Sequence, residues 1–132
     1  MLTIKFEENP KKALEQMGVV APSDSLVMTM CDGDVIMGLG IVRMMREYAE
    51  ICDIHIAEEF RDFSLSYGMG KSLLNAVDLR GIKHVYTDMA DSEPLLRALK
   101  FKKTEDIEDK CLEEMEKHLY YLNLTGYFDA NC

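Results

Sequence analysis

The segment from residue 47 to residue 81 constrains the fold of this chain more than any other. Residues 47–56 alternate as a β-strand does, and apolar side chains fall on both predicted faces: Tyr48, Cys52, Ile54 and Ile56 with Glu50 on one, and Ala49 and Ile51 with Asp53 and His55 on the other. Such a pattern is typical of a central strand. Ser66 is the predicted N-cap of a helix that runs to about Leu79, and Gly81 is its stop signal. A buried strand followed by an amphipathic helix indicates an α/β fold in which the helix packs on the sheet.

The rest of the chain predicts strands and helices on both sides of this unit. Strands are expected at 2–6, 25–30, 35–44, 83–87, 101–104 and 118–124, and helices at 11–17 and 92–100. The dipeptide Asp32-Gly33 predicts a hairpin between the second and third strands. Gly70 lies near the apolar face of the long helix, which predicts a close approach of that helix to the sheet. With 132 residues and no linker or repeat, we expect one domain over residues 1–132.

The charge balance limits the partners. Lys and Arg number 15 against 24 Asp and Glu, so the net charge is -9, and such a surface repels a phosphate backbone. Nucleic acid is therefore not expected as a main partner. Residues 104–118 hold seven acids against Lys110 and Lys117, and this stretch is either a surface helix or an excursion from the fold. No apolar run reaches the roughly 18 residues that a membrane helix requires, so no membrane partner is expected.

The cysteines indicate a reducing compartment. Cys31, Cys52, Cys111 and Cys132 form no C-x-x-C pair, and no charged-then-apolar leader precedes the first predicted strand. The cytoplasm is the location that these features predict. The three histidines do not flank the cysteines at ligand spacing, so no metal site is expected.

The turn between the central strand and the long helix is a candidate anion site. A helix N-terminus offers free backbone N–H groups and the positive end of the helix dipole to an anion. Phosphate or pyrophosphate is the expected ligand. The residues alone leave open which nucleotide or cofactor carries it.

This segment resembles the coenzyme A segment of the GCN5-related N-acetyltransferases, the GNAT superfamily. Residues 54–66 read IHIAEEFRDFSLS and continue through Leu73-Leu74 to Arg80-Gly81-Ile82, where the family has V-x-V, P-E-Y-R, R/Q-x-x-G-x-G/A, a helix and R-G-I. Residues 92–101, SEPLLRALKF, resemble the family element N-x-x-A-x-x-L-Y-E-K-L-G-F. The resemblance covers about residues 25–124. It implies an α/β fold with a mixed, mostly antiparallel sheet flanked by helices, whose strands at 47–56 and 83–87 splay apart to admit coenzyme A.

Two registers of the loop motif are compatible with the sequence. One takes Gly68 and Gly70 as the motif glycines and shortens the helix. The other takes Arg61 as the motif arginine, with Ser64 and Ser66 in the glycine positions, and keeps the family spacing without a gap. We adopt the Arg61 register.

In that register the resemblance implies the cosubstrate site. Backbone amides of residues 63–67 would hold the pyrophosphate, Arg61 would add positive charge, and the main chain at Ile54 and Ile56 would pair with the pantetheine arm. The implied set is Ile54, His55, Ile56, Arg61, Asp62, Phe63, Ser64, Leu65, Ser66 and Tyr67. The cosubstrate is acetyl-CoA without a metal, and the partner is a small-molecule or peptide amine.

The resemblance also implies a carboxylate base on the central strand, because an amine must lose a proton before it attacks a thioester. Glu50 and Asp53 are the candidates, and we prefer Glu50 because its neighbours on the predicted face are apolar. Both can equally be ordinary solvated or paired carboxylates. Leu96 stands where many members carry a tyrosine acid, and Tyr120 and Tyr121 are the alternatives for that role.

The function that we predict is acetyl transfer from acetyl-CoA to an amine in a ternary complex. The alternative is a non-catalytic CoA-binding or protein-interaction module on the same fold, and a third interpretation is an unrelated phosphate-binding domain. One helix precedes the first hairpin where many relatives have two. The acceptor site is therefore expected to be open, or completed by a second subunit in a homodimer.

Overall fold

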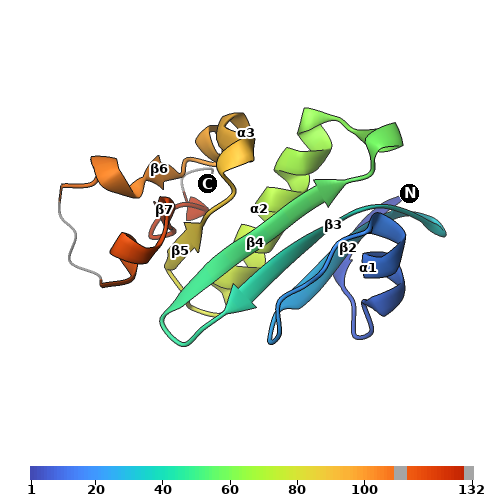
Figure 1. The fold of residues 1–132 in the computed structure, drawn as a ribbon, viewed down its shortest axis with the longest axis horizontal. Coiled ribbons are helices and arrows are strands. Elements are labelled where there is room, and N and C mark those ends of the chain that lie inside the picture. Colours follow the sequence, from blue (N-terminus) through green and yellow to red (C-terminus); the bar gives the residue numbers. More distant parts are fainter. Residues whose placement is uncertain (109–112, 130–132) are drawn as a thin grey trace.

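Seven strands pair into one sheet in the order β1-β2-β3-β4-β5-β7-β6 (Figure 1). The computed structural model describes residues 1–108 and 113–129. Every neighbouring pair is antiparallel except β4 and β5, which are parallel. The strands are β1 (Leu2–Phe6), β2 (Leu26–Asp32), β3 (Val35–Met44), β4 (Tyr48–Ile56), β5 (His84–Thr87), β6 (Lys102–Lys103) and β7 (Tyr120–Asn123). The predicted mixed, mostly antiparallel α/β sheet is confirmed, and so is the predicted order of strands and helices.

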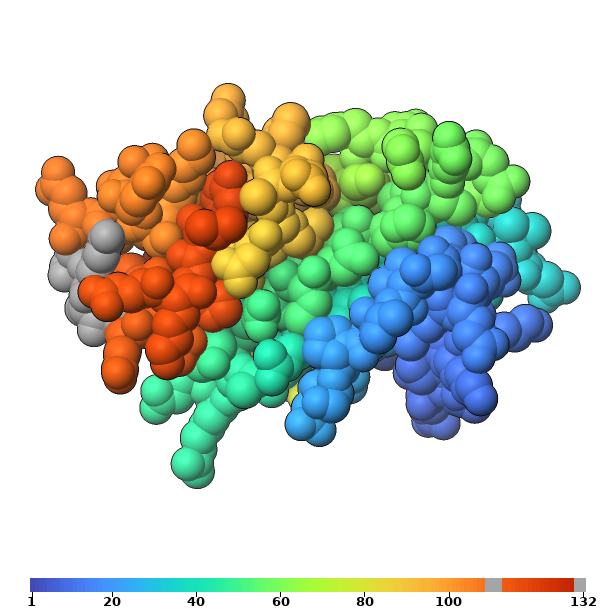
Figure 2. Space-filling model, in the orientation of Figure 1, coloured from blue at the N-terminus to red at the C-terminus, as the bar shows by residue number. Residues whose placement is uncertain are grey.

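Helices cover both faces of this sheet. The α-helices are α1 (Lys11–Met17), α2 (Phe63–Leu79) and α3 (Glu93–Ala98), and the short 3-10 turns are η1 (Glu58–Phe60), η2 (Ala90–Ser92), η3 (Thr104–Asp106) and η4 (Glu113–Lys117). Figure 1 shows α1 on one face and α2 on the other, with α3 beside α2. In the space-filling view the N-terminal segments in blue and the C-terminal segments in orange and red lie at opposite ends of the molecule (Figure 2). The centre of the sheet, with β4 and β5, lies between them.

The amphipathic pattern of each element builds two apolar layers. Between the sheet and α2 lies the larger core, to which α2 contributes Met69, Leu73, Leu74 and Val77 and α3 contributes Leu95 and Leu96, all of them buried. Between the sheet and α1 lies a smaller core of Val27, Leu39 and Ile41, packed by Leu14 and Met17. The central strand β4 faces both layers, because Ile51 and Ile56 belong to the larger core and Cys52 packs against the smaller one.

The predicted faces of β4 are wrong because the strand carries a β-bulge. Ile41 of β3 pairs with Asp53 and Val42 pairs with Ile51, so Cys52 is an extra residue in the ladder. One extra residue reverses the side-chain alternation beyond it. Ala49 and Ile51 therefore share the α2 face with Ile54 and Ile56, whereas Glu50, Asp53 and His55 share the α1 face.

The long helix begins earlier than the sequence predicts. Asp62, not Ser66, is the N-cap of α2, and its side chain accepts a hydrogen bond from the Ser64 amide at 2.8 Å. Aspartate is among the preferred N-cap residues, and its carboxylate also favours the positive end of the helix dipole. Gly70 does allow a close approach, but mainly to the Leu99 side chain after α3: an added Cβ would lie 2.6 Å from Leu99 Cδ1 and 3.4 Å from Ile54 Cδ1.

Several predicted boundaries shift by one to three residues. The turn between β2 and β3 is at Gly33-Asp34 instead of Asp32-Gly33, with Gly33 at the positive φ that such turns require. The helix predicted at 92–100 spans Glu93–Ala98, and the strand predicted at 101–104 spans Lys102–Lys103. The acidic stretch forms η3 and η4. Asp109, Lys110, Cys111 and Cys132 lie outside the described residues.

Among the described residues, every helix is too short or too polar to span a bilayer.

Candidate functional site

Strands β4 and β5 separate halfway along β4. The parallel pairing runs from Tyr48 with His84 to Ile51 with Thr87, whereas β4 continues to Ile56. The separation thus begins at Cys52, the extra residue of the bulge. We call this point the fork, defined by Ile51, Cys52 and Thr87. The predicted splay of the two strands is present.

Beyond the fork, the main chain of β4 has a free edge on its β5 side. The Ala57 amide donates to the Met37 carbonyl at 2.8 Å, so the backbone of residue 57 points to β3. Backbone groups of successive residues in a strand point to alternate sides. The amides and carbonyls of Ile54 and Ile56 therefore point to the side that β5 has left, where an extended ligand can pair with them.

A cavity of about 620 Å³ lies along this free edge. Its walls come from β4, from the turn and first residues of α2, and from the segment that leads into α3. The lining residues are Ile54, His55, Ile56, Arg61, Phe63, Ser66, Asp91, Ser92, Pro94 and Leu95. Arg61 is the one lysine or arginine among the lining residues that the structure describes, and Asp91 carries the opposing charge. Shape and main chain therefore define this site more than positive side chains do.

Six of the ten predicted cosubstrate-binding residues line this cavity, and four do not. Asp62, Ser64, Leu65 and Tyr67 are the four, and each is held by the helix itself or by its packing. Tyr67 packs against the larger core. Arg61 precedes α2 and lines the cavity, whereas Gly68 and Gly70 of the alternative register lie inside the helix.

The amides of Ser64, Leu65 and Ser66 at the start of α2 have internal partners in this structure. The Asp62 carboxylate accepts from both the amide and the hydroxyl of Ser64, at 2.8 and 2.9 Å, and the Asp62 carbonyl accepts from the amides of Leu65 and Ser66. The two Ser64 bonds lower the pKa of the Asp62 carboxyl, so the group is ionised at neutral pH. A negative charge thus lies at the position where the sequence predicted a pyrophosphate.

A cluster of titratable groups lies at the fork. Glu50, Asp88 and His118 each place one side-chain atom within 4.8 Å of the others. Glu50 pairs in register with Tyr86, one position before the last β4–β5 pair, and Asp88 follows the end of β5. Glu50 also lies 3.4 Å from the Arg43 guanidinium. The cluster thus brings two carboxylates and an imidazole together at the fork.

His118 is fixed in place by its neighbours. Its Nδ1 lies 3.0 Å from Asp88 Oδ2, and the other oxygen of Asp88 accepts from the Leu119 amide at 2.8 Å. The imidazole stacks on the ring of Tyr86 with centroids 5.0 Å apart, and its Nε2 lies 3.4 Å from Glu114. Each ring nitrogen therefore faces a carboxylate, which accepts its N–H when the ring is protonated.

The remaining catalytic candidates lie outside the cluster. Asp53 is on the same face of the sheet as Glu50, but it lies beyond the bulge and pairs with Ile41. Leu96 is buried, and its side chain has no group that can donate a proton. Tyr120 is buried in the larger core, and Tyr121 lies beside His84, whose Nδ1 is 2.7 Å from its hydroxyl.

Asp88 and His118 are the residues that sequence reasoning missed. A signal for Asp88 was available, because it directly follows the strand parallel to β4, and ligand sites in α/β folds gather at the carboxyl ends of parallel strands. For His118 the sequence offered no such signal, since it lies thirty residues further on and meets Asp88 only through the pairing of β5 with β7.

Comparison with solved structures identifies the architecture. The chain is similar to a Bacillus subtilis acetyltransferase in complex with CoA (TM-score 0.70, 15% identity, 94% of this chain and 99% of that chain covered). It is also similar to the ribosomal-protein-S18-alanine N-acetyltransferase of Escherichia coli (TM-score 0.63, 12% identity, 92% of this chain and 90% of that chain covered). A third similar structure is a GNAT family acetyltransferase of Elizabethkingia anophelis with acetyl-CoA bound (TM-score 0.57, 14% identity, 92% of this chain and 94% of that chain covered). No protein-family model and no curated protein matches the sequence.

The sheet order, the fork and the position of α2 define an acyl-CoA N-acyltransferase architecture. Within that class, the chain has the fold of the GCN5-related N-acetyltransferases.

Proposed function

We propose that this protein is an N-acetyltransferase that transfers an acetyl group from acetyl-CoA to an amine in a ternary complex. The observation that carries the proposal is the fork, because it exposes a strand edge beside a cavity at the start of α2. The similar structures from B. subtilis and E. anophelis hold CoA and acetyl-CoA, which supports the same cosubstrate here.

The residues that line the cavity suit such a cosubstrate. The main chain of Ile54 and Ile56 can pair with the amides of the pantetheine arm, and Arg61 can neutralise part of the pyrophosphate charge. The Ser66 hydroxyl lines the cavity and can donate to a phosphate oxygen. Acetyl-CoA itself supplies the activated acetyl thioester.

The proton chemistry is assigned to the fork. Attack by a neutral amine forms a C–N bond while the C–S bond breaks, and CoA leaves as a thiolate that takes up a proton from water. The proton that the amine loses needs an acceptor. We assign that role to Glu50, because it lies at the fork beside Asp88 and His118. Much of the rate would come from holding the amine and the thioester together.

A titration of the chain with acetyl-CoA and with ATP tests the cosubstrate. Micromolar to millimolar acetyl-CoA binding by calorimetry, tighter than ATP binding, is the expected result. No heat with acetyl-CoA at millimolar concentration would reject both the enzyme and the CoA-binding module. Preferential ATP binding would favour an unrelated phosphate-binding domain.

Two charge variants beside the cavity sharpen this test. Arg61→Ala should weaken acetyl-CoA binding by about tenfold, the usual loss for one charge-assisted contact. Asp62→Asn keeps a competent helix N-cap but removes the negative charge next to the phosphate position, so it should strengthen binding. Unchanged affinity in both variants would favour the alternative register with Gly68 and Gly70.

Release of free CoA thiol over a panel of amines then separates an enzyme from a binding module. Turnover that rises with one acceptor class is expected. A chain that binds acetyl-CoA and turns over with no amine would be the non-catalytic module. Homodimer formation and a cytoplasmic location stay predictions, which gel filtration and fractionation of cells check.

A further inference from the structure

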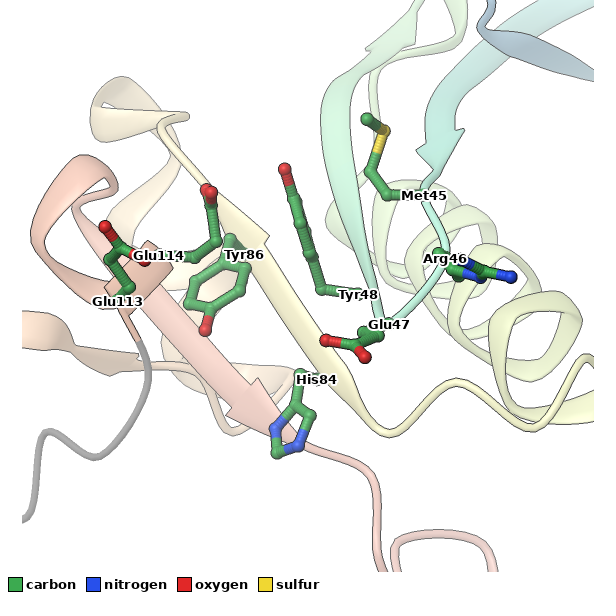
Figure 3. Close-up of a pocket in the computed structure, with 8 residues that line it drawn as sticks. All are labelled: Met45, Arg46, Glu47, Tyr48, His84, Tyr86, Glu113 and Glu114. Atoms are coloured by element: carbon green, nitrogen blue, oxygen red, sulfur yellow. The ribbon is translucent and has the colours of Figure 1, made fainter.

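A second cavity, of about 610 Å³, lies on the face opposite α2, at the end of the β4–β5 pair where both strands begin (Figure 3). Its walls come from the turn before β4, from the paired beginnings of β4 and β5, and from η4. Two tyrosines, Tyr48 and Tyr86, and three glutamates, Glu47, Glu113 and Glu114, are among its lining residues. The cosubstrate cavity shares none of these residues.

This cavity lies next to the titratable cluster at the fork. Tyr86 lines the cavity and stacks on His118, and Glu114 lines it and lies 3.4 Å from His118 Nε2. Tyr86 also pairs in register with Glu50. Glu50 and His118 do not line the cavity themselves, but each is a direct neighbour of one of its lining residues.

The lining is chemically suited to an organic cation. Tyr86 is buried, and Tyr48, which meets it edge-on with ring centroids 5.5 Å apart, is the half-exposed aromatic ring of the lining. Aromatic rings attract ammonium groups. Burial and then the charge of Glu114 raise the pKa of the Tyr48 hydroxyl, so this ring stays neutral in a negative field. Figure 3 shows the carboxylate of Glu47 on the side of the cavity, whereas the guanidinium of Arg46 points away from the other labelled side chains.

The carboxylates of the cavity are incompletely neutralised. Glu114 is paired with Lys117 at 3.2 Å. Within residues 1–108 and 113–129, neither Glu47 nor Glu113 has an ion pair or hydrogen-bond partner for its side chain. Glu47 precedes Glu50 by three residues along an almost extended chain, which separates the two positions by about 10 Å.

We propose that this cavity binds the acceptor and that the acceptor is an elongated aliphatic diamine. This inference rests on the proposed acetyl transfer and specifies its substrate. One amine lies at the fork, where it loses its proton to Glu50 and attacks. The second amine stays protonated beside Glu47 and Glu113. The attacking nitrogen must become neutral, so only a second cationic group benefits from those carboxylates throughout the reaction.

The test compares 1,5-diaminopentane with 1-aminopentane, which differ only in the second ammonium group. The diamine should show a kcat/KM at least about tenfold higher in the thiol-release assay, the gain expected for one well-placed charge. The double variant Glu47→Gln and Glu113→Gln should remove most of this advantage. Glu116→Gln, an exposed change in η4 outside the cavity lining, is the matched control and should leave the advantage intact.

A direct binding measurement keeps this inference separate from the proposed function. Calorimetric titration of the chain alone with 1,5-diaminopentane should show binding that the double variant loses and Glu116→Gln retains. If acetyl-CoA does not bind but the diamine does, the acetyl-transfer proposal fails and the cation site stands. Equal rates and equal affinities for the two amines would overturn the cation site, even in an active acetyltransferase.

Discussion

At the scale of the single residue, the surroundings of the Glu50 carboxylate are set by side chains from other strands and segments. Arg43 lies 3.4 Å from its carboxylate, and Asp88 and His118 complete a cluster at the fork. Asp53 is on the same strand and the same face, yet lies beyond the bulge and outside the cluster. The two carboxylates are therefore a natural test pair for the position of the proton acceptor.

We predict that Glu50→Gln lowers kcat by about 100-fold or more, the range for loss of a positioned base, with little change in acetyl-CoA affinity. Asp53→Asn should retain most of the activity, and it serves as the control on the same strand. Steady-state thiol release and calorimetry measure the two quantities. The opposite ranking of the two variants would assign the base to Asp53.

The reactivity of the Cys52 thiol also depends on its surroundings in the fold. It is the extra residue of the bulge, half-buried against the smaller core, and burial raises the pKa of its thiol to about 11. A thiol with that pKa is almost entirely protonated at neutral pH, and the thiolate is the nucleophilic form. Cys52 is therefore positioned as a small packing residue and not as a nucleophile.

At the scale of the element, α2 links the core to the cosubstrate site. Its apolar face is buried against the sheet, and its N-terminus, capped by Asp62, borders the cavity. The helix contains Gly68 and Gly70, which have different surroundings. An added Cβ at Gly68 meets no atom within 4 Å, whereas at Gly70 it would meet Leu99 Cδ1 at 2.6 Å.

These surroundings predict opposite effects of the same substitution. Gly68→Ala should raise the free energy of unfolding by roughly 0.5–1 kcal/mol, because alanine is the better helix former. Gly70→Ala should lower it, because overpacking a buried contact costs roughly 1–3 kcal/mol and exceeds that gain. Urea denaturation of the two variants measures both values. Equal stabilisation by both would show that Leu99 can move away without cost.

At the scale of the whole molecule, the -9 net charge conflicts with the binding of a polyanion. Arg61 is the one lysine or arginine among the described residues that line the cosubstrate cavity, and Asp62 and Asp91 lie beside it. Long-range repulsion by the protein as a whole therefore opposes the local attraction. Main-chain groups of β4, which carry no net charge, must supply much of the affinity.

This balance predicts an unusual salt dependence. Added salt screens repulsion between the protein and acetyl-CoA as well as attraction by Arg61, since the Debye length falls to about 8 Å at physiological ionic strength. Between 50 and 300 mM NaCl the affinity for acetyl-CoA should change by less than about threefold, or increase. Calorimetric titrations at several salt concentrations measure it. A steep decrease would mean that further basic side chains hold the phosphates.

The sequence by itself determined the elements and the sheet class of this protein. Apolar periodicity located the strands and helices, Gly81 marked the end of the long helix, and the segment 54–66 carried the resemblance to the GNAT fold. These features are local, because propensity, periodicity and caps act over one or two turns of chain. Ser66 was nevertheless the wrong N-cap, since Asp62 competes for the same helix start and is held by Ser64.

Only the tertiary structure decided the composition of the sites. The bulge at Cys52 reversed the faces of β4, and a one-residue insertion in a ladder is invisible in a period-two pattern. The pairing of β5 with β7 brought His118 to Asp88, and η4 brought Glu114 to Tyr86 across the second cavity. Contacts between residues about thirty positions apart depend on the packing of the whole sheet, and local sequence signals do not encode them.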